Sequence, residues 1–205
     1  NEPDSNMQAS LIKKNKDYLD KILKEVHGLK LLITSYLNYS RPNTANPVFV
    51  DLPKIFYEIE NVFKAALLKH DVKLKFDLQL KTFLFDENHL KQILLNLLAN
   101  CIESFSAHRN SGGNRDILII TKEENGSGLI SVSDNGSGIA EQNLKLIFNP
   151  FFTTKKNGTG LGLAISRKLC LENNAELLLE KDADNGGKGA TFVIAKKNRQ
   201  NEYIK

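Results

Sequence analysis

A polar stripe crosses an otherwise apolar segment at residues 86–107. The segment opens with Asp86, a residue type that favours the N-cap of a helix, and its apolar residues recur at helical spacing. The stripe comprises His89, Gln92, Asn96, Asn100 and Glu103. An ordinary solvent-exposed face would use Lys, Glu and Arg in preference to Asn. Two carboxamides one turn apart, Asn96 and Asn100, indicate oxygen ligands for a hard cation or donors to a polar ligand; the alternative is a half-exposed polar face.

Two glycine-containing segments follow this helix. A strand pattern at 129–133 leads into Asp134-Asn135-Gly136-Ser137-Gly138-Ile139, and a basic loop leads into Gly158-Thr159-Gly160-Leu161-Gly162-Leu163. Glycines allow close backbone approach, and the helix that opens at the second segment offers N–H groups and positive potential to phosphate. The second segment lacks the Gly-Lys-Ser/Thr of a Walker A loop, and it does not directly follow a strand as a dinucleotide fingerprint does. Each segment alone is weak evidence, but the three together favour a nucleotide site.

The surrounding elements must bring these segments together. Hydrophobic periodicity predicts strands at 49–52, 72–78, 81–85, 116–122, 128–134, 176–181 and 190–195, and helices at 53–70, 86–107, 141–147 and 160–172. Asn125-Gly126 is a hairpin turn signal. Strands mixed with helices on one side predict an α+β fold, a two-layer α/β sandwich.

A long helix precedes this domain. Apolar residues at alternating three- and four-residue steps from Ile12 to Tyr36 form a heptad seam, and Arg41-Pro42 ends the helix. Because one helix does not bury such a seam alone, we expect a partner helix from a second chain or from sequence outside this one. Packing against the chain's own domain is the alternative.

The composition narrows the class of protein. The chain has 205 residues, 41% hydrophobic and 25% charged, with a net charge of +4 that owes much to the tail at 196–205, so a nucleic-acid partner is not expected. No apolar run approaches the roughly 18 residues of a membrane helix. Cys101 and Cys170 fall in apolar helical patterns and indicate buried thiols in a reducing, cytoplasmic compartment. The chain begins at Asn1 without a signal peptide, and we expect it to be part of a longer protein, with membrane anchoring of the parent left open.

In this order, the segments resemble the catalytic and ATP-binding domain of sensor histidine kinases, in the superfamily that includes DNA gyrase, the MutL repair proteins and a heat-shock chaperone. The matching elements are the N box (Leu90 to Glu103), the G1 box (Asp134 to Ile139), the F box (Phe148 to Phe152), the G2 box (Gly158 to Leu163) and a closing segment at 187–192. The resemblance implies a Bergerat-type fold with a mixed sheet packed on helices. It divides the chain into a partial dimerisation helix (1–42, the second helix of the hairpin), a linker (43–47), the catalytic domain (48–196) and a basic tail (197–205).

The resemblance also implies what the site residues bind. Asn100 would ligate Mg²⁺ bridging the ATP phosphates, while Asn96 would contact phosphate or metal-bound water. Asp134 would accept a hydrogen bond from the adenine amine, so GTP should bind poorly. Gly136 and Gly138 would let the backbone pass close to the base.

The same resemblance assigns the remaining residues of the ATP site. A lid over the triphosphate would be hinged and anchored by the G2 segment, which comprises Gly158, Thr159, Gly160, Leu161, Gly162 and Leu163. Lys155 or Lys156 would meet the phosphate charge, and Thr191 would support Asp134 through water. The F-box aromatics are expected to pack the root of the lid.

The implied function is an ATP-dependent protein histidine kinase core of a two-component system. It would transfer the γ-phosphoryl group to a histidine on a dimerisation helix missing from this chain, for onward transfer to an aspartate of a response regulator, within a homodimer formed through the N-terminal helix. Hydrolytic relatives have a glutamate where Asn96 stands, so little ATPase activity is expected. Without the acceptor histidine, this chain should not phosphorylate itself. The alternatives are an ATPase or serine kinase of the same superfamily, or a non-catalytic nucleotide-binding module.

Three positions depart from the family pattern. Glu103 stands where many of these kinases have a lysine, and Cys101 replaces a small alanine. Asn173-Asn174-Ala175 stands where His-Gly-Gly usually turns the last helix into a strand. Because Asn tolerates a left-handed turn, we expect this last change to affect the local turn more than the activity.

Overall fold

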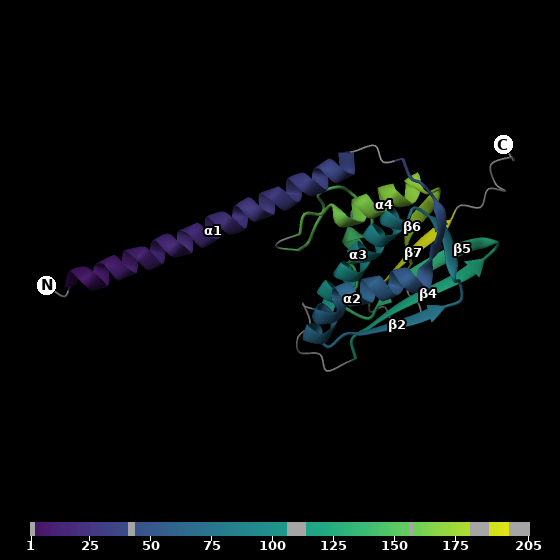
Figure 1. The fold of residues 1–205 in the computed structure, drawn as a ribbon, viewed down its shortest axis with the longest axis horizontal. Helices are drawn as coiled ribbons and strands as arrows, with labels where there is room; N and C mark the ends of the chain where they lie inside the picture. The colour runs from purple at the N-terminus through teal and green to yellow at the C-terminus, as the bar shows by residue number, and fades with distance from the viewer. Residues whose placement is uncertain (1–2, 41–43, 106–113, 156–157, 181–188, 197–205) are drawn as a thin grey trace.

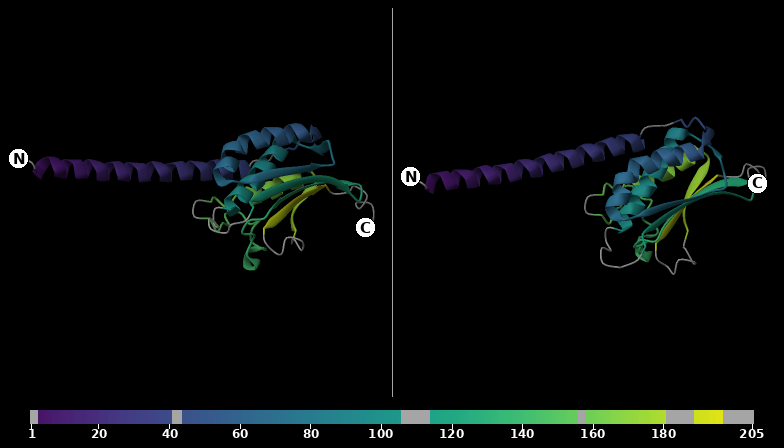
Figure 2. Two further views of the ribbon diagram at one scale, coloured as in Figure 1. Left: turned by 90° about the horizontal axis from the view of Figure 1, so that it is seen from below. Right: turned by 60° about the horizontal axis from the view of Figure 1, so that its bottom comes forward.

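The N-terminal helix extends far from the rest of the molecule (Figure 1). The computed structural model describes residues 3–40, 44–105, 114–155, 158–180 and 189–196. Helix α1 (Pro3–Ser40) is longer than the predicted helix and ends directly before Arg41-Pro42. Its seam is exposed, with Ile12 at 68% and Ile33 at 55% relative accessibility. The alternative that the seam packs on the chain's own domain is therefore wrong, because α1 meets this domain only near its C-terminal end (Figures 1 and 2).

The rest of the chain forms helices packed on a mixed sheet. Its elements are β1 (Val48–Asp51), α2 (Leu52–His70), β2 (Lys73–Leu78), β3 (Thr82–Phe85), α3 (Glu87–Ser104), β4 (Asp116–Glu124), β5 (Ser127–Asp134), η2 (Glu141–Asn143), α4 (Gly162–Glu172), β6 (Ala175–Glu180) and β7 (Ala190–Lys196). Among the described residues, one sheet has the order β2-β4-β5-β7-β6, and β1 pairs with β3 in a second sheet. Strand β2 is parallel to β4, whereas β4, β5, β7 and β6 pair antiparallel.

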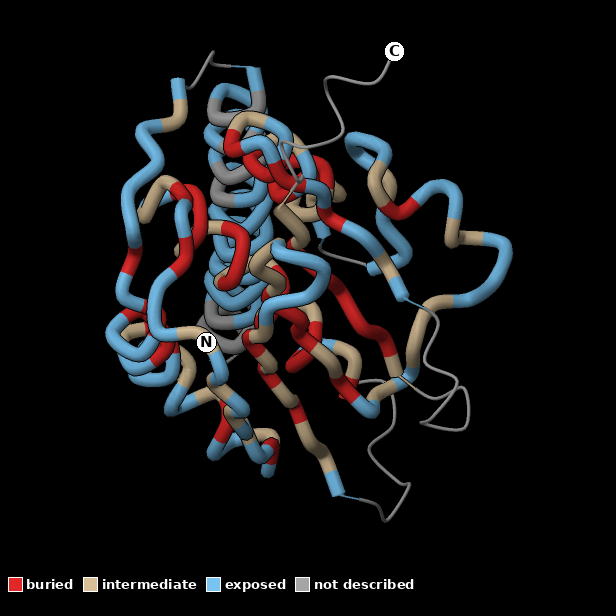
Figure 3. The backbone as a smooth tube through the Cα atoms, turned by 90° about the vertical axis from the view of Figure 1, so that its right-hand side faces the viewer, coloured by how far each residue is buried: buried red, intermediate tan, exposed pale blue. Residues whose placement is uncertain are grey.

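The three helices α2, α3 and α4 cover one face of the five-stranded sheet, and buried residues lie between the layers (Figures 2 and 3). This arrangement confirms the predicted α+β two-layer sandwich. Helix α3 lies at its centre, where its apolar side chains, including Leu90, Ile93, Leu94, Leu97 and Leu98, are fully buried. Burial on most of its circumference leaves one narrow polar stripe to face a ligand.

Several predicted helix ends and turns agree with the structure to within a few residues. Asp86 caps α3 as predicted, since its carboxylate accepts the backbone N–H of His89 at 3.0 Å. Asn125 and Gly126 have φ values of +52° and +73°, the positive pair that a two-residue β-hairpin requires. Helix α3 ends at Ser104, before the predicted limit at 107.

The predicted helix before α4 is wrong, whereas the predicted α4 is present and starts two residues later than expected. The segment predicted as a helix at 141–147 contains only the 3₁₀ turn η2, without a side-chain cap, and of its residues only Ile147 is buried. With a single buried apolar residue, the segment has no stripe that would stabilise a longer helix. Helix α4 begins at Gly162 and not at Gly160, because Gly160 has a φ of +67°, which is left-handed and incompatible with a right-handed helix.

Candidate functional site

Asn96 joins the middle of α3 to the start of α4. Its Nδ2 donates to the carbonyl oxygen of Gly162 at 3.1 Å and to the hydroxyl oxygen of Ser166 at 3.2 Å. Ser166 is fully buried, and its hydroxyl donates to the same Gly162 carbonyl at 2.9 Å. Because the amide nitrogen is used within the protein, the carbonyl oxygen of Asn96 is the group that can face a ligand.

Asn100 lies one turn further along α3 and contacts the basic loop. The Nζ atom of Lys155 donates to Asn100 Oδ1 at 2.6 Å and also forms an ion pair with the Glu103 carboxylate. The amide oxygen of Asn100 therefore faces a cation in this structure. Amide and carboxylate oxygens are the ligands that Mg²⁺ prefers, so this donor set fits the predicted metal.

Asp134 ends β5 and is 4% exposed. Its Oδ1 accepts the backbone N–H of Gly136 at 2.8 Å and the hydroxyl of Ser104 at 3.0 Å. Ser104 follows Asn100 by one helical turn. Asp134 therefore lies beside the turn of α3 that comes directly after the turn of Asn100. From Asn96 to Ser104 the helix rises about 12 Å, a span that suits an extended nucleoside triphosphate.

The first glycine segment packs tightly beneath Asp134. A Cβ atom on Gly136 would lie 1.9 Å from the Ser104 hydroxyl, so close packing with α3 requires glycine there. Gly138 lies against Gly189, whose carbonyl oxygen would be 2.8 Å from an added Cβ. The sequence assigned these glycines to backbone passage near the base; the structure gives them a further reason, which is contact with the protein itself.

The second glycine segment brings the start of α4 to Asn96. Leu161 is fully buried, while Gly162 and Leu163 are partly buried and begin the helix, which has no side-chain cap at its N-terminus. Within the loop, Thr159 Oγ1 accepts the N–H of Leu161 at 3.4 Å, and a Cβ atom on Gly158 would lie 2.5 Å from Thr153 Oγ1. Such a helix start presents N–H groups and positive potential to an anion.

The roles predicted for Lys156 and Thr191 are not tested by the structure. Lys156 lies outside the described residues. Thr191 on β7 is buried, and its hydroxyl bonds that of Ser133 at 2.8 Å. Its water-mediated support of Asp134 stays a prediction.

The F-box aromatics divide into two groups. Phe148 packs edge-on against Phe192, with ring centroids 6.4 Å apart, and Phe152 also packs against the core. Phe151 instead is 52% exposed and stacks on Tyr36 of α1, with centroids 6.4 Å apart. Core packing is thus confirmed for Phe148 and Phe152 and wrong for Phe151, which contacts the N-terminal helix.

His89 lies in a buried polar cluster. This member of the predicted polar stripe is only 8% exposed, and its Nδ1 lies 3.0 Å from Asn173 Nδ2, so it packs inside the protein. Asn173 Oδ1 in turn accepts the backbone N–H of Asp86 at 2.7 Å. The residue that departs from the family pattern therefore fastens the end of α4 to the N-cap of α3, and Asn174 makes the expected left-handed turn with a φ of +52°.

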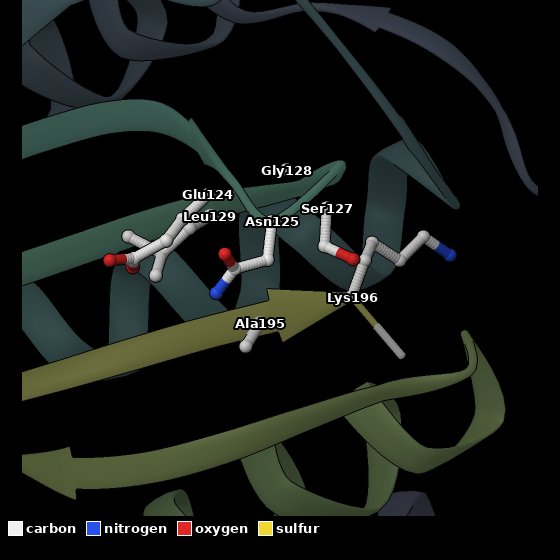
Figure 4. A pocket seen from close by; sticks show the side chains of 7 residues that line it. All are labelled: Glu124, Asn125, Ser127, Gly128, Leu129, Ala195 and Lys196. Carbon is white, nitrogen blue, oxygen red and sulfur yellow. The ribbon is translucent and has the colours of Figure 1, made fainter. Parts of the chain in front are cut away.

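A surface hollow of about 300 Å³ lies elsewhere, at the β4–β5 hairpin (Figure 4). It is lined by Glu124, Asn125, Ser127, Gly128, Leu129, Ala195 and Lys196. Asp134 lies at the opposite end of β5, about 23 Å away by strand rise. This hollow is therefore separate from the site on α3.

Comparisons with known proteins show the family to which this chain belongs. Residues 85–200 match the family described as "Histidine kinase-, DNA gyrase B-, and HSP90-like ATPase". The chain belongs to this family. Within it, the chain is similar to the signal transduction histidine-protein kinase AtoS of Escherichia coli (strain K12), with 34% identity over 88% of this chain and 29% of AtoS. It is also similar to sporulation kinase E of Bacillus subtilis (strain 168), with 31% identity over 90% of this chain and 24% of that kinase.

Solved structures of histidine kinases have the same fold as this chain. The catalytic domain of histidine kinase ThkA superposes with a TM-score of 0.61 at 28% identity, covering 74% of this chain and 95% of that domain. ThkA in complex with the response regulator protein TrrA gives a TM-score of 0.68 at 25% identity over 87% of this chain and 50% of that one. The α+β domain of this chain is therefore a catalytic ATP-binding domain of the histidine kinase type. It spans only about a quarter to two fifths of several curated kinases that it matches.

Within the described residues, no helix is both long and apolar enough to cross a membrane.

Proposed function

We propose that this chain binds Mg²⁺-ATP along α3 and donates the γ-phosphoryl group to a histidine on a dimerisation helix, for onward transfer to a response regulator aspartate. The observation that supports this most directly is the shared helix. Neighbouring turns of α3 contact Asp134 through Ser104 and the basic loop through Asn100, and a third turn contacts the start of α4 through Asn96. An adenine acceptor, a cation ligand and an anion-binding helix end are thereby aligned.

Each part of the nucleotide has a residue suited to it. The Asp134 carboxylate accepts a hydrogen bond from the adenine amine, where guanine would present a second acceptor. The N–H groups at the start of α4 receive the phosphates, and Lys155 neutralises part of their charge. Asn100 ligates Mg²⁺, with Glu103 and the carbonyl oxygen of Asn96 within the same stripe. When bound, the metal would offset the charge on the phosphate oxygens.

The described residues around Asn96 and Asn100 include no unpaired carboxylate or imidazole placed to act as a base for hydrolysis. Asn96 occupies the position one turn before Asn100 and does not accept a proton from water at neutral pH. Glu103 lies on the other side of Asn100 and is ion-paired with Lys155. Alignment of the triphosphate without an activated water favours transfer to a supplied nucleophile over ATPase activity.

The domain division belongs to the same proposal. Residues 1–42 act as the second helix of a dimerisation hairpin, 43–47 as a linker, 48–196 as the catalytic domain and 197–205 as a basic tail. The exposed seam of α1 supports this role, since its apolar residues from Ile12 to Ile33 are all more than half exposed. The receiver domain of a response regulator is the expected protein partner.

The histidines of this chain support an acceptor on another helix. The His70-Asp71 pair ends α2: Asp71 has a φ of +51°, and its N–H donates to the carbonyl oxygens of Leu67 and Leu68. A helix C-cap within the catalytic domain is its structural role. The side chains of His27 and His108 lie outside the described residues.

Calorimetric titration with Mg²⁺-ATP tests the proposal. We expect binding by the chain, loss of at least tenfold in affinity for Asn100→Ala, and unchanged affinity for Asn61→Ala, an exposed helical asparagine on α2. Steady-state hydrolysis should be slow, and γ-labelled ATP should leave no acid-sensitive label on this chain. Absence of nucleotide binding, or brisk hydrolysis abolished by Asn100→Ala, would contradict the proposal.

A further inference from the structure

Two side chains of α3 to which the proposed function gives no role in nucleotide recognition lie near Asp134. The Ser104 hydroxyl is 3.0 Å from Asp134 Oδ1. The Cys101 thiol, one turn earlier on the same helix, lies within range of the negative charge of this carboxylate. Cys101 is 1% exposed. Together with the backbone N–H of Gly136, these groups provide donors from two sides of a carboxylate that is itself buried.

The thiol is a donor and not a competing anion. The ordinary pKa of a cysteine thiol, about 8.5, already lies above neutral pH, so the buried Cys101 thiol keeps its proton. The Ser104 hydroxyl has one proton and two acceptors, Asp134 and the carbonyl oxygen of Cys101 at 2.7 Å. A carboxylate is the stronger acceptor of the two, because hydrogen bonds to ionised groups are stronger than those between neutral groups.

These contacts fix the state and the direction of the carboxylate. A buried carboxylate stays charged only where donors replace the water it has lost. A carboxylate that is already charged and oriented does not have to reorganise when a ligand arrives, which raises the affinity for a matching donor. A ligand without that donor does not bind more tightly because the carboxylate is charged and oriented in advance.

We propose that Ser104 and Cys101 are positioning residues that keep Asp134 an oriented acceptor and thereby set the preference of this site for 6-aminopurines. This inference rests on the proposed function, in which Asp134 contacts the adenine amine. It assigns the discrimination to α3 as well as to β5, and it explains why glycine is required at position 136, where a Cβ atom would displace the Ser104 hydroxyl.

The test compares ATP with purine riboside triphosphate, which has the same ring without the amine, by calorimetry with Mg²⁺. We expect Ser104→Ala to lower ATP affinity about tenfold, the loss of one hydrogen bond to a charged group, and to change the affinity for purine riboside triphosphate less than twofold. Cys101→Ala should show a smaller loss in the same direction, and Cys101→Ser, which keeps a donor, should bind ATP like the wild type.

Ser166→Ala provides the matched control, because it removes a buried serine hydroxyl from the Asn96 end of the site. It should change the affinities for both nucleotides by the same factor. Alanine favours helix at position 104, so Ser104→Ala should fold, and a thermal melt checks this. Equal losses for both nucleotides in Ser104→Ala, or no loss for either, would overturn the inference.

Other results of the same experiment would contradict the proposed function itself. If the wild type binds both nucleotides equally well, or Asp134→Asn leaves ATP affinity unchanged, Asp134 does not contact the amine and both proposals fall. If the wild type discriminates and Asp134→Asn abolishes the difference while Ser104→Ala and Cys101→Ala do not, only the positioning role is wrong.

Discussion

Lys155 contacts two acceptors on α3, and this contact bears on how the site would accept a metal ion. Its ammonium group lies 2.6 Å from Asn100 Oδ1 and is ion-paired with Glu103. An ammonium group and Mg²⁺ repel each other at close range, so both cannot occupy the same amide oxygen. Binding of Mg²⁺-ATP would therefore move Lys155 from Asn100 to the triphosphate, which makes this side chain a link between α3 and the loop before α4.

At the residue scale, Lys155→Gln should weaken ATP binding about tenfold and AMP binding much less. In the proposed complex the lysine charge would interact with the distal phosphates that AMP lacks, and charge-assisted contacts are stronger than neutral ones. Titrations of both nucleotides measure the difference, which should shrink as salt is raised. Lys145→Gln, an exposed lysine near η2, is the matched control and should bind both nucleotides normally. A similar loss for ATP and AMP would argue against this role.

At the scale of elements, the sequence predicted those features that depend on interactions between residues close together in the chain. The buried surface of α3, its Asp86 cap and the Asn125-Gly126 hairpin all follow from spacing and residue type. Contacts between distant segments did not: Ser104 and Asp134 are 30 positions apart, and His89 and Asn173 are 84 apart. The one available signal was that Ser104 follows Asn100 by four residues, which extends the polar stripe towards Asp134.

The turn into α4 gives a prediction for an element boundary. Gly160→Ala should destabilise the fold by at least about 1–2 kcal/mol, the usual cost of a left-handed non-glycine residue. A Cβ atom there would also lie 2.4 Å from the backbone carbonyl carbon of Phe151. Gly162→Ala is the control for stability, because its nearest atom, in Asn96, is 3.7 Å away. Urea unfolding of both variants measures this; equal destabilisation would contradict the strained-turn explanation.

The N-cap of α3 gives a pH prediction. Burial alone would raise the pKa of Asp86, but hydrogen bonds from the backbone N–H groups of Asn46 and His89 outweigh it and lower the pKa below the ordinary 3.8. Folding therefore favours the charged form, and the stabilisation is complete above the ordinary value and lost as pH falls through the lower, folded-state pKa. Asp86→Asn keeps a good cap but removes the charge. Urea unfolding should show the wild type more stable near neutral pH, with the difference shrinking below about pH 4; a pH-independent difference would contradict it.

At the scale of the whole molecule, α1 meets the catalytic domain at Phe151, in the segment that precedes α4. Tyr36, the last residue of the predicted seam, stacks on Phe151, and the Phe151 backbone lies against Gly160. A helix that pairs through its seam would thus bring its partner close to the segment that leads into α4. The seam itself remains exposed along most of α1, which is costly for an isolated helix in water.

We therefore expect the chain to self-associate through α1, with the catalytic domain unaffected. Replacing Ile22 and Val26 together by Glu puts two charges into the seam, where burying an unpaired charge is unfavourable, and should raise the dissociation constant of the dimer at least about a hundredfold. Lys24→Glu changes an exposed charge between them and is the matched control. Sedimentation velocity over a concentration series measures association, and calorimetry should give the same ATP affinity for all three proteins. If the wild type sediments as a monomer throughout, or the double variant still dimerises, the seam is not the interface.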